Sequence, residues 1–334
     1  MSKPFYLSKK RVVAGITALL IVFLFALGLF FLKQWEFRTG TQNPEGNSPS
    51  TQERAEIYVG GKKYVQKDHM ESVLFIGIDS YEKPSGNSYV NGQQADLLML
   101  VVLDHQARTY TSLQINRDTM AAFQTLGVTG ENGGMITAQI AMSHAYGTGE
   151  NDSSRNTTKA VSNLLFDTEI PHFATIRMSA ISTLNDAVGG VTLELMDDFS
   201  MLDGSFKKGE TVTLNGEQAT AYVQYRGQLE DSTNISRMKR QRQYMTAWMS
   251  ALQASLEKDK DFITRTSLKI ADDFISDMDA EKLDELANCL TTYTSCGILD
   301  IPGDSVKGEQ FMEFHVDDDA LQQMVLELFW TSAE

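Results

Sequence analysis

Residues 73–79 read Val-Leu-Phe-Ile-Gly-Ile-Asp, and residues 96–103 read Asp-Leu-Leu-Met-Leu-Val-Val-Leu. Continuous apolar runs of this length are typical of strands that are buried on both faces of a sheet. Asp79 ends the first run and Asp96 begins the second. Because ligands bind at strand ends in open α/β sheets, we expect these two carboxylates to hold a hard divalent cation such as Mg²⁺. The alternative is structural: Asp79 caps a turn and Asp96 starts a strand.

The sequence on either side alternates between strand and helix patterns. A hairpin is predicted over residues 57–65, around Gly60-Gly61. Further strands are expected at 109–115, 173–178, 191–195 and 211–214, and helices at 159–166, 180–188, 217–225, 235–256, 280–292 and 317–329. Buried strands that alternate with helices predict an α/β fold in one domain, which we expect to be a three-layer α-β-α sandwich with a central mixed sheet.

Arginines form a second group of candidate residues. Arg117-Asp118 follows the strand at 109–115, Arg226 follows a helix, and Arg237 and Gln241 share one face of the helix at 235–256. A planar guanidinium binds phosphate oxygens bidentately, so arginines from three segments suit a clamp for pyrophosphate. The alternative is that the arginines at 226, 237 and 240 form solvated salt bridges with some of the 44 acidic residues.

The balance of charge excludes one class of partner. Lys and Arg number 29 against 44 Asp and Glu, a net charge of −15. Residues 1–33 hold five of the cations and no acid, so residues 34–334 carry 24 against 44, a net charge of −20. Such an acidic domain is unsuited to binding along DNA or RNA, and we expect no nucleic-acid partner. An anionic ligand would need a few placed cations or a metal.

The N-terminal segment predicts attachment to a membrane. Residues 12–32 are 21 successive apolar or small residues, which as a helix would span roughly 31 Å, close to a bilayer core. The run is longer than the core of a cleaved signal peptide, so we predict one retained transmembrane helix. Lys and Arg before it place residues 1–11 in the cytoplasm. Residues 39–56 predict a flexible linker, and residues 57–334 an extracytoplasmic domain of a single-pass protein of the cell membrane.

The two cysteines leave a disulfide open. On one continuous helix, the Cα atoms of Cys289 and Cys296 would lie about 10 Å apart, which is too far for a bridge. Residues 291–295 look more like a helix end followed by a loop, which would let the thiols meet. The five histidines are scattered and no Cys-x-x-Cys occurs, so a structural zinc site has little support.

Seven motifs in series resemble those of the LytR-CpsA-Psr family. They are Val73-Leu-Phe-Ile-Gly-Ile-Asp79, Ala95-Asp-Leu-Leu-Met-Leu-Val101, Ser112-Leu-Gln-Ile-Asn-Arg-Asp118, Asn185-Asp-Ala-Val-Gly-Gly-Val191, Leu214-Asn-Gly-Glu-Gln-Ala219, Ala221-Tyr-Val-Gln-Tyr-Arg-Gly227 and Arg237-Met-Lys-Arg-Gln241. The similarity runs from about residue 71 to residue 252 and continues more weakly to the last helix. The N-terminal span and linker also resemble the membrane anchor of the family.

The resemblance implies an extracytoplasmic phosphotransferase that attaches a glycopolymer, such as a teichoic acid or a capsular polysaccharide, to peptidoglycan. The donor would be a polyprenyl-pyrophosphate-linked glycan, with its lipid tail in the apolar interior of the fold. By the same resemblance, Asp79 and Asp96 match the acids that hold Mg²⁺ in the family. The positions of the family that contact pyrophosphate correspond to Arg117, Arg226, Arg237 and Gln241. Asp96, or less favourably Asp118, would accept the proton of the attacking hydroxyl.

Three positions depart from the pattern of the family. Gln94, Gln224 and Tyr81 stand where its members usually carry arginine. A charged hydrogen bond stabilises by about 1.5–3 kcal/mol and a neutral one by about 1. The two glutamines would therefore reduce affinity or turnover by roughly one to three orders of magnitude. The competing hypothesis is a non-catalytic, membrane-anchored protein that binds polyprenyl-pyrophosphate glycans or scaffolds wall assembly.

Overall fold

The computed structural model describes residues 54–79, 93–127, 130–147, 149–225, 229, 233–259 and 262–333. The predicted cytoplasmic tail, the transmembrane helix at 12–32 and most of the linker at 39–56 lie outside the described residues, as do Tyr81 and Arg226. Of the helices that the described ranges contain, none is both long and apolar enough to cross a membrane.

A six-stranded sheet forms the centre of the molecule, with the order β11-β8-β3-β4-β5-β12. Its strands are β3 (Met70–Ile78), β4 (Ala95–Asp104), β5 (Thr109–Ile115), β8 (His172–Arg177), β11 (Phe274–Ser276) and β12 (Thr294–Asp300). Strands β3 and β8 pair in parallel, as do β5 and β12, whereas β4 runs antiparallel to both of its neighbours and β11 antiparallel to β8. The predicted central mixed sheet is confirmed.

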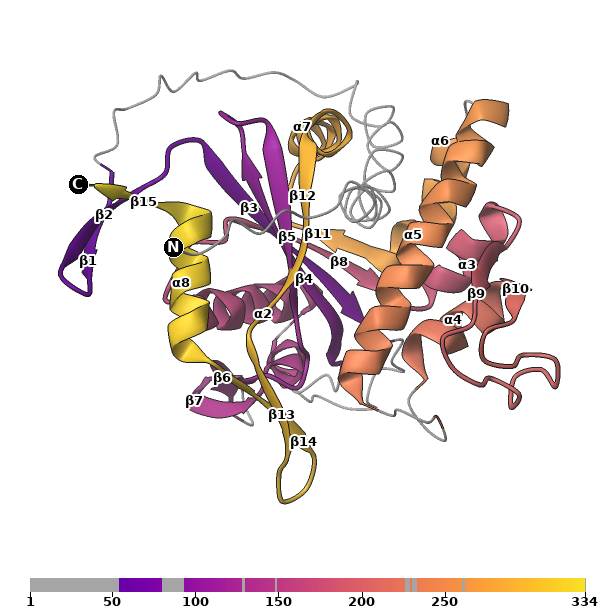
Figure 1. The fold of residues 1–334 in the computed structure, drawn as a ribbon, viewed down its shortest axis with the longest axis horizontal. Coiled ribbons are helices and arrows are strands. Elements are labelled where there is room, and N and C mark those ends of the chain that lie inside the picture. Colours follow the sequence, from indigo (N-terminus) through magenta and orange to yellow (C-terminus); the bar gives the residue numbers. More distant parts are fainter. Residues whose placement is uncertain are drawn as a thin grey trace, which may run out of the picture.

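Helices cover both faces of this sheet and produce three layers (Figure 1). One core lies between the sheet and α3 (Ala180–Ala187), α4 (Gly216–Gln224), α5 (Asn234–Lys258), α6 (Phe262–Lys269) and α7 (Ala280–Thr292). The other lies between the sheet and α2 (Glu150–Leu164) and α8 (Asp318–Phe329). Val73 and Phe75 enter the first core while Leu74 and Ile76 enter the second, which explains the unbroken apolar run of β3.

Strand directions bring the candidate residues to one edge of the sheet. The carboxyl ends of β3 and β5 meet there, beside the start of β4, because β4 is antiparallel to both. A β-bulge sharpens this arrangement: Gly77 pairs with Leu97 and Ile78 pairs with Ala95, which leaves Asp96 as the extra residue of β4. Bulges of this kind redirect a side chain and recur beside active sites.

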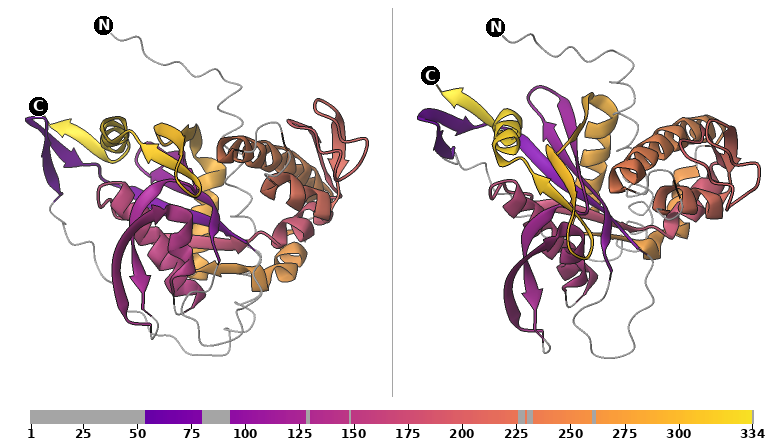
Figure 2. Two further views of the ribbon diagram at one scale, coloured as in Figure 1. Left: turned by 90° about the horizontal axis from the view of Figure 1, so that it is seen from below. Right: turned by 60° about the horizontal axis from the view of Figure 1, so that its bottom comes forward.

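Several smaller elements surround the sheet (Figures 1 and 2). The predicted hairpin at 57–65 is confirmed as β1 (Glu56–Val59) and β2 (Lys62–Gln66), and β15 (Trp330–Ala333) joins it as a third strand. Strands β9 (Val191–Glu194) and β10 (Thr211–Leu214) also pair. Two hairpins were not predicted: β6 (Met120–Leu126) with β7 (Asn132–Gln139), and β13 (Gly303–Lys307) with β14 (Met312–Val316). Short 3-10 helices lie at η1 (Ile140–Ala145) and η2 (Ala271–Asp273).

The two cysteines are not bridged. Cys289 is buried on α7, whereas Cys296 is exposed on β12. The helix does end before a new element, as the pattern at 291–295 indicated. That element is a strand of the central sheet, however, and the disulfide that the sequence left undecided is not formed: both thiols are free.

Candidate functional site

Asp96 lies at the centre of the candidate site. Arg117, which follows β5, donates from Nη1 to Asp96 Oδ1. Arg237, in the first turn of α5, donates from Nη1 to the same oxygen at 3.0 Å. The three side chains are buried, and none is more than 7% exposed. Two guanidinium groups on one carboxylate form charge-assisted hydrogen bonds, the stronger class of these interactions.

Asp79 pairs with Asp96 across the sheet edge, and the two carboxyl groups hydrogen-bond. Burial raises the pKa of Asp79 to about 6; the hydrogen bond and the charge of Asp96 add to this, while Arg117 and Arg237 oppose it. Burial also acts to raise the pKa of Asp96, but the charges of Arg237 and Arg117 outweigh it and lower that pKa. Asp96 therefore stays ionised, and Asp79 is the member of the pair that takes up a proton first.

Two neutral amides stand in the site at positions where the resemblance implied arginine. Gln94 Oε1 accepts a hydrogen bond from Arg117 Nη2. Gln224 Nε2 donates to Asp79 Oδ1 at 3.3 Å. Both glutamines satisfy charged partners without adding positive charge. In the described part of the site, the arginines at 117 and 237 are already paired with a carboxylate, so an anionic ligand would gain from an added cation.

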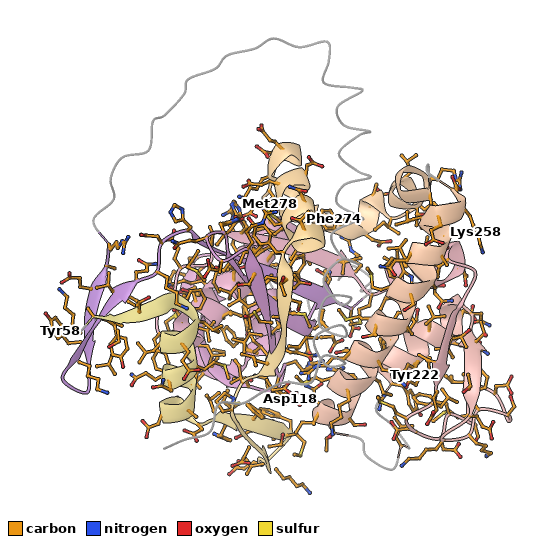
Figure 3. All side chains as sticks on the ribbon, turned by 45° about the horizontal axis from the view of Figure 1, so that its top comes forward. Tyr58, Asp118, Tyr222, Lys258, Phe274 and Met278 are labelled. Atoms are coloured by element: carbon orange, nitrogen blue, oxygen red, sulfur yellow. The ribbon has the colours of Figure 1, made fainter. Side chains whose placement is uncertain are left out.

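A network of asparagines joins the charged cluster to Asp118. Arg237 Nη2 donates to Asn234 Oδ1 at 2.6 Å, and Asn234 Nδ2 donates to Asn116 Oδ1, also at 2.6 Å. The same oxygen of Asn116 accepts from the backbone N–H of Asp118 at 3.0 Å. Asp118 lies at the edge of the sheet near the start of α5 (Figure 3), where Gln139 Nε2 donates to its Oδ1 at 3.0 Å.

Arg240 has a different role from Arg237. Its Nη1 donates to Asp197 Oδ2 at 2.8 Å, and its Nε donates to the carbonyl oxygen of Tyr222 at 3.0 Å. Its guanidinium also lies 5.5 Å from the ring centre of Phe199. The alternative for Arg240 was a solvated salt bridge with an acidic residue. The salt bridge is present, but it is buried rather than solvated, because the side chain is 0% exposed.

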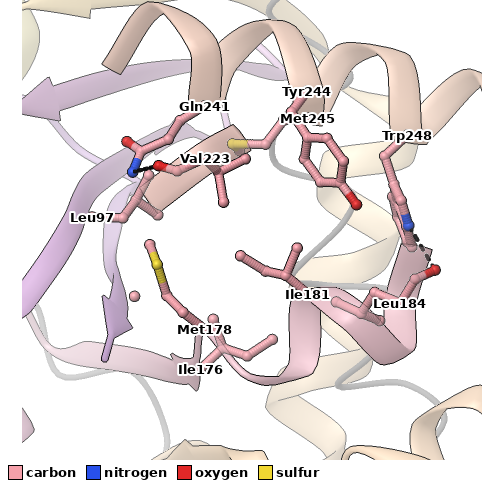
Figure 4. Close-up of a pocket in the computed structure, with 11 residues that line it drawn as sticks. Leu97, Ile176, Met178, Ile181, Leu184, Val223, Gln241, Tyr244, Met245 and Trp248 are labelled. Atoms are coloured by element: carbon pink, nitrogen blue, oxygen red, sulfur yellow. Dashed lines mark hydrogen bonds between the residues drawn. The ribbon is translucent and has the colours of Figure 1, made fainter. Parts of the chain in front are cut away.

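An apolar pocket opens beside the carboxylate pair. It has an empty volume of about 620 Å³, the open solvent at its mouth included. Figure 4 shows side chains of β4, β8 and α3 facing those of α5 across it. The lining residues are Gly77, Leu97, Ile176, Met178, Ile181, Leu184, Val223, Gln241, Tyr244, Met245 and Trp248. Leu97 directly follows Asp96, so the pocket and the charged cluster adjoin.

The structure thus brings most of the predicted residues together. Asp79, Asp96, Arg117 and Arg237 form one cluster, and Asp118 adjoins it through Asn116. Gln241 lies on the same face of α5 as Arg237, but there it lines the apolar pocket and donates from Nε2 to the carbonyl oxygen of Val223 at 3.3 Å. Arg226 lies outside the described residues.

The carboxylate pair fits the divalent cation that the sequence predicts. Mg²⁺ usually takes one or two carboxylates together with phosphate oxygens and water. Asp79 and Asp96 offer hard oxygen donors close to each other, and burial, together with the hydrogen bond and the charge of Asp96, raises the pKa of Asp79. Within the described ranges, no cluster of three or more His, Cys, Asp and Glu is placed to hold a metal.

Sequence reasoning missed the two asparagines of the network. Asn116 and Asn234 are separated by 118 residues, and each is a residue type that also serves in turns and caps. The available signal was position: Asn116 follows the end of β5 directly, and Asn234 lies three residues before Arg237. Neither signal shows that the two side chains meet.

A buried cluster of carboxylates and arginines thus lies at the strand ends of a three-layer α/β sandwich, beside an apolar pocket. The model of the LytR_cpsA_psr family matches residues 37–329. The chain therefore belongs to the LytR-CpsA-Psr family.

Two relatives illustrate the similarity in sequence. The polyisoprenyl-teichoic acid–peptidoglycan teichoic acid transferase TagU of Bacillus anthracis is 25% identical over 317 residues, 94% of this chain and 95% of that protein. The TagU of Halalkalibacterium halodurans is 29% identical over 176 residues, 53% of this chain and 51% of that protein.

Two solved structures illustrate the shared fold. The structure described as TagT bound to LIIa-WTA superposes with a TM-score of 0.55 at 22% identity, covering 78% of this chain and 90% of that one. Protein gbs0355 from Streptococcus agalactiae gives a TM-score of 0.59 at 18% identity, covering 77% and 87%.

Proposed function

We propose that this protein is a phosphotransferase that attaches a glycopolymer from a polyprenyl-pyrophosphate lipid to peptidoglycan. The observation that carries the proposal is the pairing of Asp96 with Arg117 and Arg237 next to an apolar pocket, which Leu97 lines. Such a site matches both ends of a lipid pyrophosphate, because one part binds charge and the other excludes water. The names of the TagU relatives support a teichoic acid as the polymer.

In the proposed reaction, a hydroxyl oxygen of peptidoglycan attacks the phosphorus that bears the glycan. A phosphodiester bond to the acceptor forms, the bridging P–O bond of the pyrophosphate breaks, and polyprenyl monophosphate leaves. Arg117 and Arg237 orient the phosphoryl oxygens and stabilise their charge, which is the main requirement of phosphoryl transfer. The proton of the hydroxyl passes to Asp96 or to Asp118; the lowered pKa of Asp96 weakens it as a base.

A cation and a membrane anchor complete the proposal. Asp79 and Asp96 would hold Mg²⁺, which would neutralise the pyrophosphate oxygens when bound. The apolar segment at 12–32 would anchor the chain in the cell membrane with its N-terminus in the cytoplasm, and so place residues 57–334 outside the cell beside a lipid donor.

The test uses the full chain in detergent with a lipid-pyrophosphate glycan, peptidoglycan and Mg²⁺, and it measures glycan bound to insoluble peptidoglycan. We expect transfer that is lost with EDTA and falls at least about 100-fold in Asp96→Ala and Arg237→Met. The matched control is Arg155→Met, which removes an exposed arginine of α2 paired with Asp277 at 3.8 Å, outside the site. Equal losses in Arg237→Met and Arg155→Met would contradict the assignment.

A second candidate is a protein that binds the lipid-linked glycan without transferring it. The observation that favours it is the presence of Gln94 and Gln224 beside the charged cluster, because both are neutral. The same assay separates the two functions. Binding of the donor without transfer, and with no gain in Gln94→Arg/Gln224→Arg, would support binding alone; a rate increase in that double variant would support an enzyme slowed by the two amides.

A further inference from the structure

A second hollow lies on another side of α5 from the apolar pocket. It has an empty volume of about 710 Å³, its mouth included, and lies between the start of α5, the end of β5 and the segment that joins β12 to β13. Its lining from α5 comes from residues 235, 238, 239 and 242, whereas the apolar pocket uses residues 241, 244, 245 and 248. At 3.6 residues per turn, these two faces are separated by roughly a third of a turn.

Asn116 lines this groove and has an unused hydrogen-bond donor. The residue is 3% exposed, and its Nδ2 atom finds no hydrogen-bond partner within the described residues. The orientation of the amide is set by its oxygen, which accepts from both Asn234 Nδ2 and the backbone N–H of Asp118. A flipped amide would place a donor against two donors, so the nitrogen must point away from them. A buried donor without a partner is costly. The nitrogen exposes less than 1 Å² of surface, so a ligand oxygen would satisfy it once the side chains that line the groove shift slightly.

Three charged side chains line the other walls of the groove: Lys239, which is exposed, Arg242 and Asp300. Arg242 binds Asp300 through both terminal nitrogens and donates from Nε to Gln114 Oε1, so its charge is neutralised and its plane is held in place. Pro302 and Phe314 contribute apolar surface to the lining. A saccharide presents acceptor oxygens and apolar C–H faces together, which is the chemistry that this lining matches.

We propose that this groove binds the acceptor saccharide, with Asn116 Nδ2 donating to a hydroxyl or N-acetyl oxygen of the sugar. The acceptor role rests on the function proposed above. Asn116 directly precedes Arg117, and its oxygen binds the backbone of Asp118, so a sugar held here lies next to the charged cluster. Donor and acceptor would approach that cluster from different sides of α5.

The experiment measures binding of chitotetraose, a soluble tetrasaccharide of N-acetylglucosamine, to the full chain in detergent by calorimetry, with no donor present. Asn116→Asp keeps the oxygen that accepts from Asn234 and Asp118 and replaces the donor nitrogen by an acceptor. We expect it to weaken binding at least about tenfold. The matched control is Asn163→Asp, which adds the same charge on α2, and it should change binding less than about twofold. Ile235→Trp, at an exposed rim position of the groove, should also weaken binding.

Each outcome decides the proposal. Failure of the wild-type chain to bind millimolar chitotetraose, or equal binding by Asn116→Asp and Asn163→Asp, overturns it. If Asn116→Asp does not fold, unchanged binding by Ile235→Trp overturns it and weakened binding supports it. Saccharide binding in the groove without any transfer would support the groove as a binding site and contradict the proposed reaction. Transfer with an unchanged acceptor KM in Asn116→Asp would support the proposed reaction and contradict the groove as the acceptor site.

Discussion

Arg237 and Arg240 lie three residues apart on α5, yet their side chains meet different partners. Arg240 is enclosed with Asp197, whereas Arg237 shares Asp96 with Arg117. Removing one partner of a buried pair leaves the other charge uncompensated, at a cost of about 3–5 kcal/mol. We therefore expect Arg240→Met to lower the free energy of unfolding by about that amount in urea titrations. Arg237→Met should lower it less, because Arg117 still neutralises Asp96, and an equal loss would contradict this separation.

His144 is a buried residue outside the site, and burial lowers its pKa to about 4; the positive charge of Arg177 adds to this and a backbone hydrogen bond with Gln93 opposes it. Between that value and the ordinary pKa of about 6.5, the unfolded chain binds a proton that the folded chain excludes. Stability therefore falls as pH falls through this window. From pH 7 to pH 5, we expect the wild-type chain to lose about 2 kcal/mol more than His144→Gln, measured by urea unfolding. Equal losses would place the titration elsewhere.

Among the elements, α3 and α4 pack through a glycine. A Cβ atom on Gly216, the first residue of α4, would lie 2.6 Å from the carbonyl oxygen of Ser182 and 2.7 Å from Asp186 Oδ2. We expect Gly216→Ala to push α4 away from α3 and to cost about 1–3 kcal/mol of stability by thermal unfolding. Because Val223 of α4 lines the apolar pocket, donor affinity should fall as well. Gly204→Ala, where a Cβ meets nothing within 4 Å, is the control that should change neither.

The elements that could be predicted are those whose own sequence carries the signal. Strand β3 is apolar on both faces, and α8 repeats its apolar residues at helical spacing, so both were predicted close to their observed limits. Strand β7 offers no such signal: it begins Asn-Gly-Gly and most of its side chains are exposed. Its pairing with β6 is specified by tertiary contact, which short windows of sequence do not contain.

The candidate site was predictable to the level of strand ends. Asp79 and Asp96 follow from the rule that ligands bind where buried strands end. The bulge at Gly77 and Ile78 leaves no mark in the sequence, although it makes Asp96 the extra residue of β4. Arg237 and Asp96 are 141 residues apart in the sequence. Only the folded structure shows that their side chains meet.

In the molecule as a whole, the chain enters the fold at the end of the sheet away from the site. Strands β1, β2 and β15 lie beyond the amino-terminal end of β3 (Figure 1), whereas Asp79 of the site follows its carboxyl end. Nine residues of β3 span roughly 30 Å. In the proposed arrangement, the linker at 39–56 must let the domain turn its site toward the lipid. Deleting nine of its residues would remove about 30 Å of reach.

We expect that deletion to slow transfer from a donor embedded in vesicles at least about tenfold, and to leave transfer from a water-soluble, short-chain donor unchanged. Replacing the deleted residues by nine Gly and Ser residues should restore the rate, because reach and not composition is required. Equal rates with both donors would mean that the linker does not limit access.

The apolar pocket and the groove beside α5 share no lining residue. Under the two proposals above, donor and acceptor bind at separate places, so that neither would have to leave before the other binds. Initial rates measured against both concentrations should then give intersecting double-reciprocal lines, the signature of a ternary complex. Parallel lines would indicate a substituted-enzyme intermediate, in which the chain itself carries the glycan between two half-reactions.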